Sequence, residues 1–161
     1  MSRDPDKALI GWLIGTLDID VDHGVTRPKT PLCAEDITEI GALKPTILVI
    51  EDDKAVRDSL RMVLELYGYE VDEYSSGEEL LAHGVQNDGA CVILDVNLPG
   101  ANGLNVLEKL RAMDNPVPAI VVSGRATEEV HAQAKRLNAL AFFDKPIDID
   151  ALIAVLGSIS N

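Results

Sequence analysis

The stretch Cys91-Val92-Ile93-Leu94-Asp95-Val96-Asn97-Leu98-Pro99-Gly100 decides the fold of this chain. Its first four residues are apolar, as in a strand that is buried on both faces. A Pro-Gly turn follows, so the carboxylate of Asp95 stands where a buried strand opens into a turn. An Asp before such a turn is often only a loop residue that bonds its own backbone. The meaning of Asp95 therefore depends on the rest of the chain.

After Pro45, an apolar run, a polar turn and a helical pattern follow one another repeatedly. Strands that alternate with helices form linked βα units, so we expect an α/β fold: a doubly wound, five-stranded parallel sheet with helices on both faces. The second apolar run alternates with polar residues like an edge strand, whereas the first, third and fourth are almost wholly apolar, like central strands. The predicted strands are 46–50, 70–74, 90–94, 119–122 and 139–143.

The composition limits the partners. The chain has 161 residues and a formal net charge of -13 at pH 7. This charge opposes direct binding to DNA or to an anionic membrane, so we expect proteins, cations or small molecules as partners. No apolar run reaches the ~20 residues of a membrane span, and no signal peptide is apparent. With only Cys33 and Cys91, we expect a reduced, cytoplasmic protein.

The chain divides into three parts. Residues 1–17 are expected to form a short helix with an apolar face, weakened by Gly11 and Gly15. A lone short helix is marginal in water, so it either caps this protein's own surface or serves in docking or self-association. Residues 18–45 are rich in Asp, Thr, Pro and Gly and indicate a linker. Residues 46–161 form the folded domain.

Polar residues follow the predicted strands where they leave the sheet. They are Glu51, Asp52 and Asp53 after the first strand, Asp95 after the third, Ser123 and Gly124 after the fourth, and Asp144, Lys145 and Pro146 after the fifth. The carboxyl ends of parallel strands share one edge of the sheet, where ligands bind in such folds. Carboxylates gathered there repel one another, which makes sense if a hard cation such as Mg²⁺ lies between them.

The same residues suit phosphoryl transfer. A carboxylate can attack phosphorus to give an aspartyl phosphate, a reaction that depends on positioning and on neutralised charge. Lys145 supplies a mobile cation and Ser123 a hydroxyl donor for phosphoryl oxygens. Each residue alone has an ordinary structural explanation, but their joint occurrence at one sheet edge favours a site.

From Pro45 to about Ser158 the chain resembles the receiver domains of two-component response regulators. The resemblance rests on four segments: Ile47-Leu48-Val49-Ile50-Glu51-Asp52-Asp53, Val92-Ile93-Leu94-Asp95-Val96-Asn97-Leu98-Pro99-Gly100 with Gly103, Ile120-Val121-Val122-Ser123-Gly124 and Phe142-Phe143-Asp144-Lys145-Pro146. It implies the flavodoxin-like strand order 2-1-3-4-5 and makes residues 46–161 the receiver domain.

The resemblance also implies a role for each site residue. Asp95 would be the phosphoacceptor, with Glu51, Asp52, Asp95 and the backbone carbonyl of Asn97 as ligands of Mg²⁺ or Mn²⁺. Lys145 would bind the phosphoryl group, and Ser123 would be the switch hydroxyl. Glu51 stands where the family more often has Asp. This familiar variant is expected to keep the metal within reach, with a water between the carboxylate and the ion.

The resemblance assigns roles to three further positions, and Phe142 departs from the family pattern. Phe142 occupies the aromatic switch position that is often Tyr, so it can rotate inward as an apolar plug but cannot make the tyrosine's hydrogen bond. Asn97 and Arg125 occupy the positions that tune dephosphorylation. Arg125 either shields the acyl phosphate or holds the attacking water, or it is simply an exposed arginine near the start of a helix, and the sequence leaves these open.

The implied function is that of a bacterial signalling phosphoprotein. A sensor histidine kinase or a histidine phosphotransfer protein would donate its phosphoryl group to Asp95, and the changed surface would act on a downstream protein target. Such a domain catalyses only its own phosphorylation and dephosphorylation and is not otherwise an enzyme. No basic recognition helix follows Asn161, so we expect output through protein contacts and not through direct DNA binding. A homodimer is one such protein contact.

Two other functions compete with this one. The first is a binding module that keeps the fold but signals without phosphorylation, with residues 1–17 as the interaction element. The second is a hydrolase with an aspartyl-phosphate intermediate. Such an enzyme typically needs a second Asp two residues after the nucleophile, and Asn97 stands there instead.

Overall fold

The computed structural model describes residues 44–86 and 89–160. The predicted helix at 1–17, Cys33 and all of the predicted linker except Lys44 and Pro45 lie outside these residues. Within the described part, no helix is long and apolar enough to cross a membrane.

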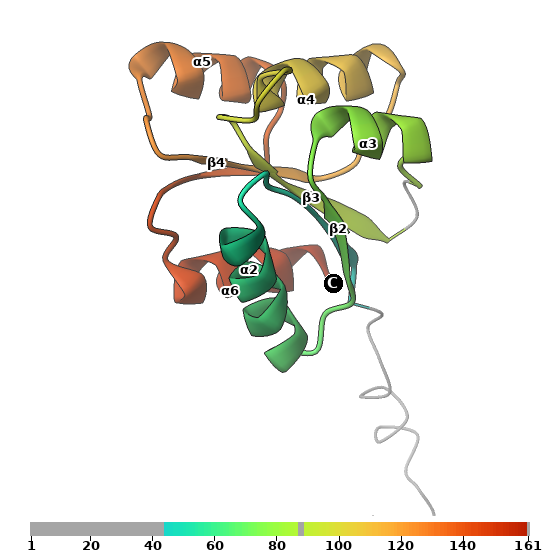
Figure 1. Ribbon diagram of the computed structural model, residues 1–161, viewed down its shortest axis with the longest axis vertical. Helices are drawn as coiled ribbons and strands as arrows, with labels where there is room; N and C mark the ends of the chain where they lie inside the picture. The colour runs from blue at the N-terminus through green and yellow to red at the C-terminus, as the bar shows by residue number, and fades with distance from the viewer. Residues whose placement is uncertain (1–43, 87–88, 161) are drawn as a thin grey trace, which may run out of the picture. The chain divides into compact units, whose positions relative to one another are not determined.

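Five parallel strands form one sheet in the order β2-β1-β3-β4-β5, as expected (Figure 1). The strands are β1 (Thr46–Ile50), β2 (Val71–Tyr74), β3 (Ala90–Asp95), β4 (Ala119–Ser123) and β5 (Ala141–Asp144). The helices are α2 (Lys54–Leu66), α3 (Gly77–His83), α4 (Gly103–Ala112), α5 (Glu128–Arg136) and α6 (Ile149–Ile159). The prediction of an α/β fold with β2 at an edge is confirmed.

The helices cover both faces of the sheet. Helices α3, α4 and α5 lie on one face, and α2 and α6 lie on the other (Figure 1). Because successive strand side chains point to opposite faces, Leu48 and Ile50 pack in the core under α3, α4 and α5, whereas Ile47 and Val49 pack under α2 and α6. Two apolar layers therefore hold the sheet rigidly, and they leave its carboxyl edge to polar residues.

Five strand ends differ from the prediction by one or two residues, among them the start of β2 at Val71 and the end of β5 at Asp144. Strands β3 and β4 include Asp95 and Ser123 as their last residues, because the backbone of each continues the sheet register. Strand β5 begins at Ala141 and not at Ala139, because Asn138 adopts a left-handed turn with φ 53° that must end before the strand starts. Asp95 and Ser123 therefore lie on the strand ends themselves, where the sheet fixes their backbone.

Cys91 lies inside the core. Its side chain is fully buried in β3 among the residues under α2 and α6, and burial raises the pKa of its thiol to about 12. A buried thiol with a raised pKa is a poor nucleophile. Cys91 is therefore a packing residue.

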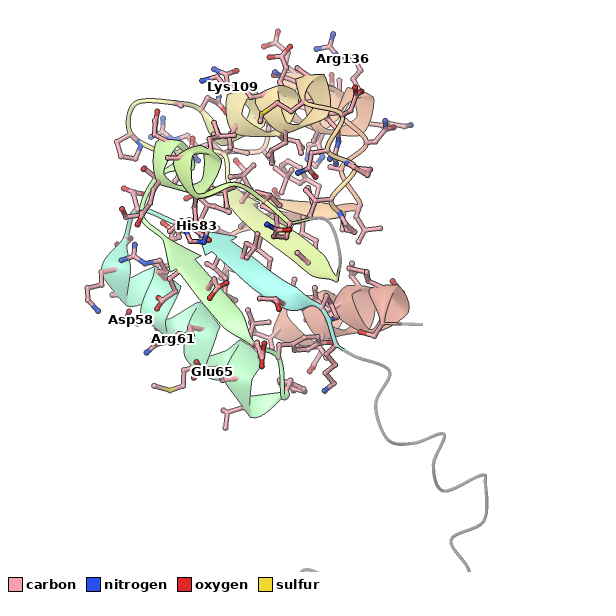
Figure 2. All side chains as sticks on the ribbon, turned by 90° about the vertical axis from the view of Figure 1, so that its right-hand side faces the viewer. Asp58, Arg61, Glu65, His83, Lys109 and Arg136 are labelled. Atoms are coloured by element: carbon pink, nitrogen blue, oxygen red, sulfur yellow. The ribbon has the colours of Figure 1, made fainter. Side chains whose placement is uncertain are left out.

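The outer face of α2 is charged. Asp58, Arg61 and Glu65 project from this helix (Figure 2), and Lys54 and Arg61 form i,i+4 ion pairs with Asp58 and Glu65. Such exposed pairs contribute little to stability, because water screens both charges. They place charged side chains on the side of α2 that faces away from the sheet.

Candidate functional site

Three side chains meet at the carboxyl edge of the sheet. The Nζ atom of Lys145 lies 2.7 Å from Oε2 of Glu51 and 2.7 Å from Oδ2 of Asp95. Glu51 follows β1, Asp95 ends β3 and Lys145 follows β5, so the sheet order brings together residues that are 50 and 94 positions apart. Glu51 and Asp95 are only 5% and 4% exposed. One cation thus joins two buried carboxylates.

Burial and charge oppose each other in this cluster. Burial raises the pKa of Glu51 above its ordinary value, although the hydrogen bond from Lys145 opposes this rise. Burial alone would lower the pKa of Lys145, but the hydrogen bonds and charges of Asp95 and Glu51 raise it above its ordinary value. Lys145 is therefore charged at neutral pH, and it offsets part of the repulsion between the carboxylates.

The acidic residues can hold a cation. One carboxylate oxygen from each of Glu51, Asp52 and Asp95 lies within 4.8 Å of the other two. Asp52 is exposed, while its two partners are buried, so the group opens to solvent on one side. Oxygen ligands of this kind, with room left for water, suit Mg²⁺. The residues present therefore fit the expected metal.

The loop that carries the acidic residues is tied to α2. The backbone N–H of Asp53 donates to Oε1 of Glu51 over 3.2 Å. Oδ1 of Asp53 in turn accepts from the N–H groups of Ala55 and Val56 and caps the first turn of the helix. Asp53 is therefore the N-cap of α2. This structural role explains why an Asp stands there, and it does not require Asp53 to bind the metal.

Asp95 is held by its own loop. The N–H of Asn97 donates to Oδ1 of Asp95 over 2.9 Å, which leaves Oδ2 for Lys145. Asn97 is itself exposed. The structure therefore brings Asn97 to the site by its N–H, whereas the use of its carbonyl as a metal ligand stays a prediction.

Gly103 supports Asp95 from behind. A Cβ atom built on Gly103 would lie 2.0 Å from the carbonyl oxygen of Asp95 and 2.9 Å from its carbonyl carbon. Both are backbone atoms of a central strand and cannot move aside. The glycine therefore lets α4 begin directly against the end of β3, where the N–H of Gly103 also bonds the carbonyl of Val96.

We expect the Gly103→Ala variant to be destabilised by about 1–3 kcal/mol, because the added methyl group must push α4 away from β3. Urea unfolding measures this change. Gly157→Ala is the control, since nothing lies within 4 Å of a Cβ at that position of α6. Equal stability of the two variants would contradict the close contact at Gly103.

Ser123 and Arg125 lie beside the carboxylates but differ in exposure. Ser123 is buried at the end of β4, and its Oγ accepts from the N–H of Arg125 over 3.1 Å. Arg125 is exposed, and its described contacts with the site run through this backbone bond. The sheet places Ser123 next to Asp144, one residue before Lys145.

Phe142 lies half-buried in β5, on the sheet face that α5 covers. Its ring centroid is 3.9 Å from that of His131, with 39° between the ring planes. The sequence does not predict this contact of His131, because helical periodicity does not show which strand residue an exposed side chain lies against. The contact identifies α5 as the neighbour of Phe142.

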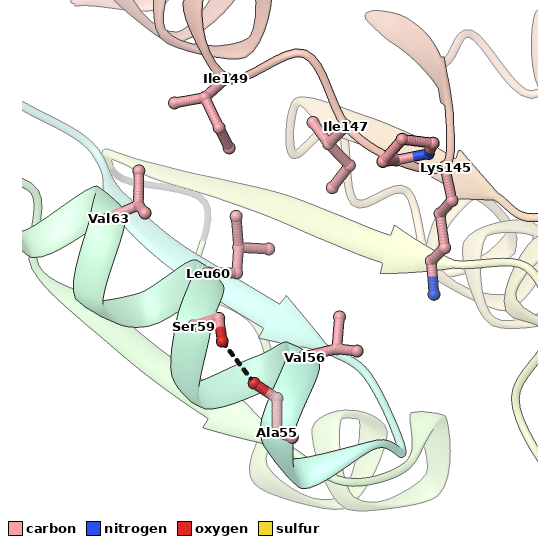
Figure 3. A pocket seen from close by; sticks show the side chains of 9 residues that line it. Ala55, Val56, Ser59, Leu60, Val63, Lys145, Ile147 and Ile149 are labelled. Carbon is pink, nitrogen blue, oxygen red and sulfur yellow. Dashed lines mark hydrogen bonds between the residues drawn. The ribbon is translucent and has the colours of Figure 1, made fainter.

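An apolar groove lies next to Lys145 (Figure 3). It has a volume of about 460 Å³ and lies between α2 and the segment that joins β5 to α6. Val56, Leu60 and Val63 line it from α2, and Ile147 and Ile149 from the other side. The groove belongs to the surroundings of the site, and Lys145 is the one titratable residue among the described residues that line it.

Sequence reasoning missed two residues behind the acidic loop, Arg57 and Glu73. Nη1 of Arg57 donates to the carbonyl oxygen of Glu51 over 2.5 Å, and its Nε lies 3.6 Å from Oε1 of Glu73. The only sequence signal was an arginine one helical turn after the acidic residues. Backbone carbonyls as partners cannot be identified from residue types alone.

Comparisons with known proteins show which family the sequence resembles. The family model described as the response regulator receiver domain matches residues 47–157. The transcriptional regulatory protein FixJ of Azorhizobium caulinodans is 38% identical over 108 residues, which are 67% of this chain and 51% of that protein. The transcriptional regulatory protein PrrA of Mycobacterium bovis is 34% identical over 116 residues, 72% of this chain and 50% of that protein. The chain spans about half the length of these curated relatives.

Solved structures share the fold. A response regulator receiver domain protein (CheY-like) from Methanospirillum hungatei superposes with a TM-score of 0.65 at 28% identity, over 72% of this chain and 93% of that one. The crystal structure of FixJ-N superposes with a TM-score of 0.66 at 25% identity, over 72% of this chain and 93% of that one.

Proposed function

The chain belongs to the response regulator receiver family of two-component systems, and we propose that Asp95 accepts a phosphoryl group from a phosphohistidine. The donor would be a sensor histidine kinase or a histidine phosphotransfer protein. The observation that carries this proposal is the contact of Lys145 with both Asp95 and Glu51 at the edge of the sheet. It joins a buried carboxylate nucleophile to a cation that can bind phosphoryl oxygens.

The transfer needs few chemical parts. An oxygen of Asp95 attacks the phosphorus atom, a P–O bond forms, and the P–N bond breaks with its electron pair going to the histidine ring. Lys145 turns from the carboxylate to the new phosphoryl oxygens, and the N–H of Asn97 keeps the aspartate oriented. Mg²⁺, held by Glu51, Asp52 and Asp95 with the carbonyl of Asn97, would supply the remaining positive charge.

The phosphoryl group adds roughly -1.5 to -2 charge at the site. In the proposed response, the Ser123 hydroxyl turns toward it and Phe142 moves inward, which changes the surface beside α5. Asn97 and Arg125 flank the site and would set how fast water removes the group. The readers of this surface would be a downstream protein or a second copy of the chain, with residues 1–17 as an interaction segment and 18–45 as its linker.

Metal dependence tests the proposal. We expect the full chain to gain one acid-labile phosphoryl group from acetyl phosphate in Mg²⁺ and none in excess EDTA, because the repulsion between donor and carboxylates is then unscreened. Intact-mass spectrometry measures the gain, and Mn²⁺ should restore it after EDTA treatment. Equal uptake with and without metal would contradict the role of the acidic residues, and no uptake at all would favour a phosphorylation-independent binding module.

A further inference from the structure

Arg57 lies directly behind the acidic loop. Its Nη1 donates to the carbonyl oxygen of Glu51 over 2.5 Å and approaches that of Asp52 at 3.4 Å. Its side chain is 14% exposed, so the guanidinium is largely shielded from water. A charged donor in such surroundings makes strong hydrogen bonds to carbonyl oxygens. Arg57 therefore holds the backbone of two residues whose side chains face the metal site.

Glu73 anchors the other side of the guanidinium. It lies on β2, in register with Val49 of β1, and its Oε1 is 3.6 Å from Nε of Arg57. This Oε1 is buried and has no hydrogen-bond partner among the described residues, so the charge of Arg57 is its main compensation. Oε2 accepts from Nη1 of Arg61 over 3.0 Å. The edge strand thus fixes the direction of the arginine.

We propose that Arg57, anchored by Glu73, is a positioning residue that fixes the carboxylates of Glu51 and Asp52 for the divalent cation. This inference rests on the proposed metal site. The inference predicts the direction in which metal affinity changes when Arg57 is replaced, because the positive charge of Arg57 by itself repels a cation. If the arginine acted only through charge, its removal would tighten metal binding. If it orients the loop, its removal weakens binding.

The test measures the affinity of the full chain for Mn²⁺ by electron paramagnetic resonance of the free ion. We expect Arg57→Met to weaken binding on the order of tenfold, the effect typical of lost support behind metal ligands. Arg61→Met is the matched control: it removes the same charge from the same helix and the same partner, Glu73, but Arg61 makes no contact with the acidic loop. It should bind Mn²⁺ at least as tightly as the wild type.

Conservative variants separate donation from folding. Arg57→Lys keeps a cationic donor for the carbonyl of Glu51 and should recover part of the lost affinity. Glu73→Gln should weaken binding more than Glu65→Gln, which removes an equal charge from the other partner of Arg61. The comparison of Glu73→Gln with Glu65→Gln decides the matter even where Arg57→Met does not fold.

Three outcomes would overturn the inference. The first is wild-type or tighter Mn²⁺ binding by a cooperatively folded Arg57→Met. The second is binding by Arg57→Lys that is no stronger than that of Arg57→Met, or, where the methionine variant is unfolded, equal affinity of Glu73→Gln and Glu65→Gln. The third is that the wild type binds no Mn²⁺. This result would contradict the proposed metal site itself, whereas the first two contradict only the role of Arg57.

Discussion

The Asp95→Asn variant is expected to accept no phosphoryl group from acetyl phosphate in Mg²⁺, where the wild type gains one. The carboxamide lacks the negative charge and the nucleophilic oxygen that form the acyl phosphate. It also removes one of the three carboxylates that can share a cation. Intact-mass spectrometry under conditions that preserve acyl phosphates compares the two proteins directly.

Asp53→Asn is the matched control for this substitution. Asp53 lies in the same cluster of strand ends, but its side chain caps α2 and accepts from two backbone N–H groups. Asn is as good a cap as Asp. The control should therefore keep its phosphoryl uptake, and uptake by Asp95→Asn equal to that of the control would show that another residue is the acceptor.

The Lys145→Met variant is expected to lose stability in EDTA, by about 1–3 kcal/mol. Removal of the ammonium leaves Glu51 and Asp95, both buried, without the cation that now lies 2.7 Å from each. The figure is below that for a fully buried pair because the lysine side chain is 29% exposed and partly screened by water. Urea unfolding in EDTA measures the change.

Mg²⁺ should restore most of the stability of Lys145→Met, because a ligand that binds the folded state stabilises it and the competing ammonium is gone. Lys54→Met is the control, since Lys54 is 76% exposed and, within residues 44–86 and 89–160, its ion pair is with Asp58 on α2. A deficit in Lys145→Met that is no larger than that of the control, or that Mg²⁺ leaves unchanged, would contradict the shared role of lysine and metal.

Local patterns in the sequence predicted most of the fold. Wholly apolar runs indicated the central strands, because a strand that is buried on both faces needs apolar side chains at every position. The alternation from Glu70 to Tyr74 indicated the edge strand, because only one of its faces is buried. The start of β5 was misplaced because the turn at Asn138 depends on a backbone conformation that its neighbours in the sequence do not reveal.

The sequence predicted which residues meet at the candidate site, but not all of the contacts that support them. Glu51, Asp52, Asp95, Ser123 and Lys145 could be placed together because parallel strands end at one edge. The contacts of Arg57 with backbone carbonyls and of His131 with Phe142 could not, because they depend on how far side chains reach across elements. Their roles, like those of the predicted site residues, are decided by experiment.

Chemical mapping of the phosphoryl group tests the central claim most directly. Borohydride reduces an aspartyl phosphate to homoserine, and tandem mass spectrometry of a digest locates the converted residue. After incubation of the full chain with acetyl phosphate and Mg²⁺, the account predicts homoserine at position 95 and at no other acidic residue. Conversion at another position, or phosphorylated protein without conversion at Asp95, would contradict it.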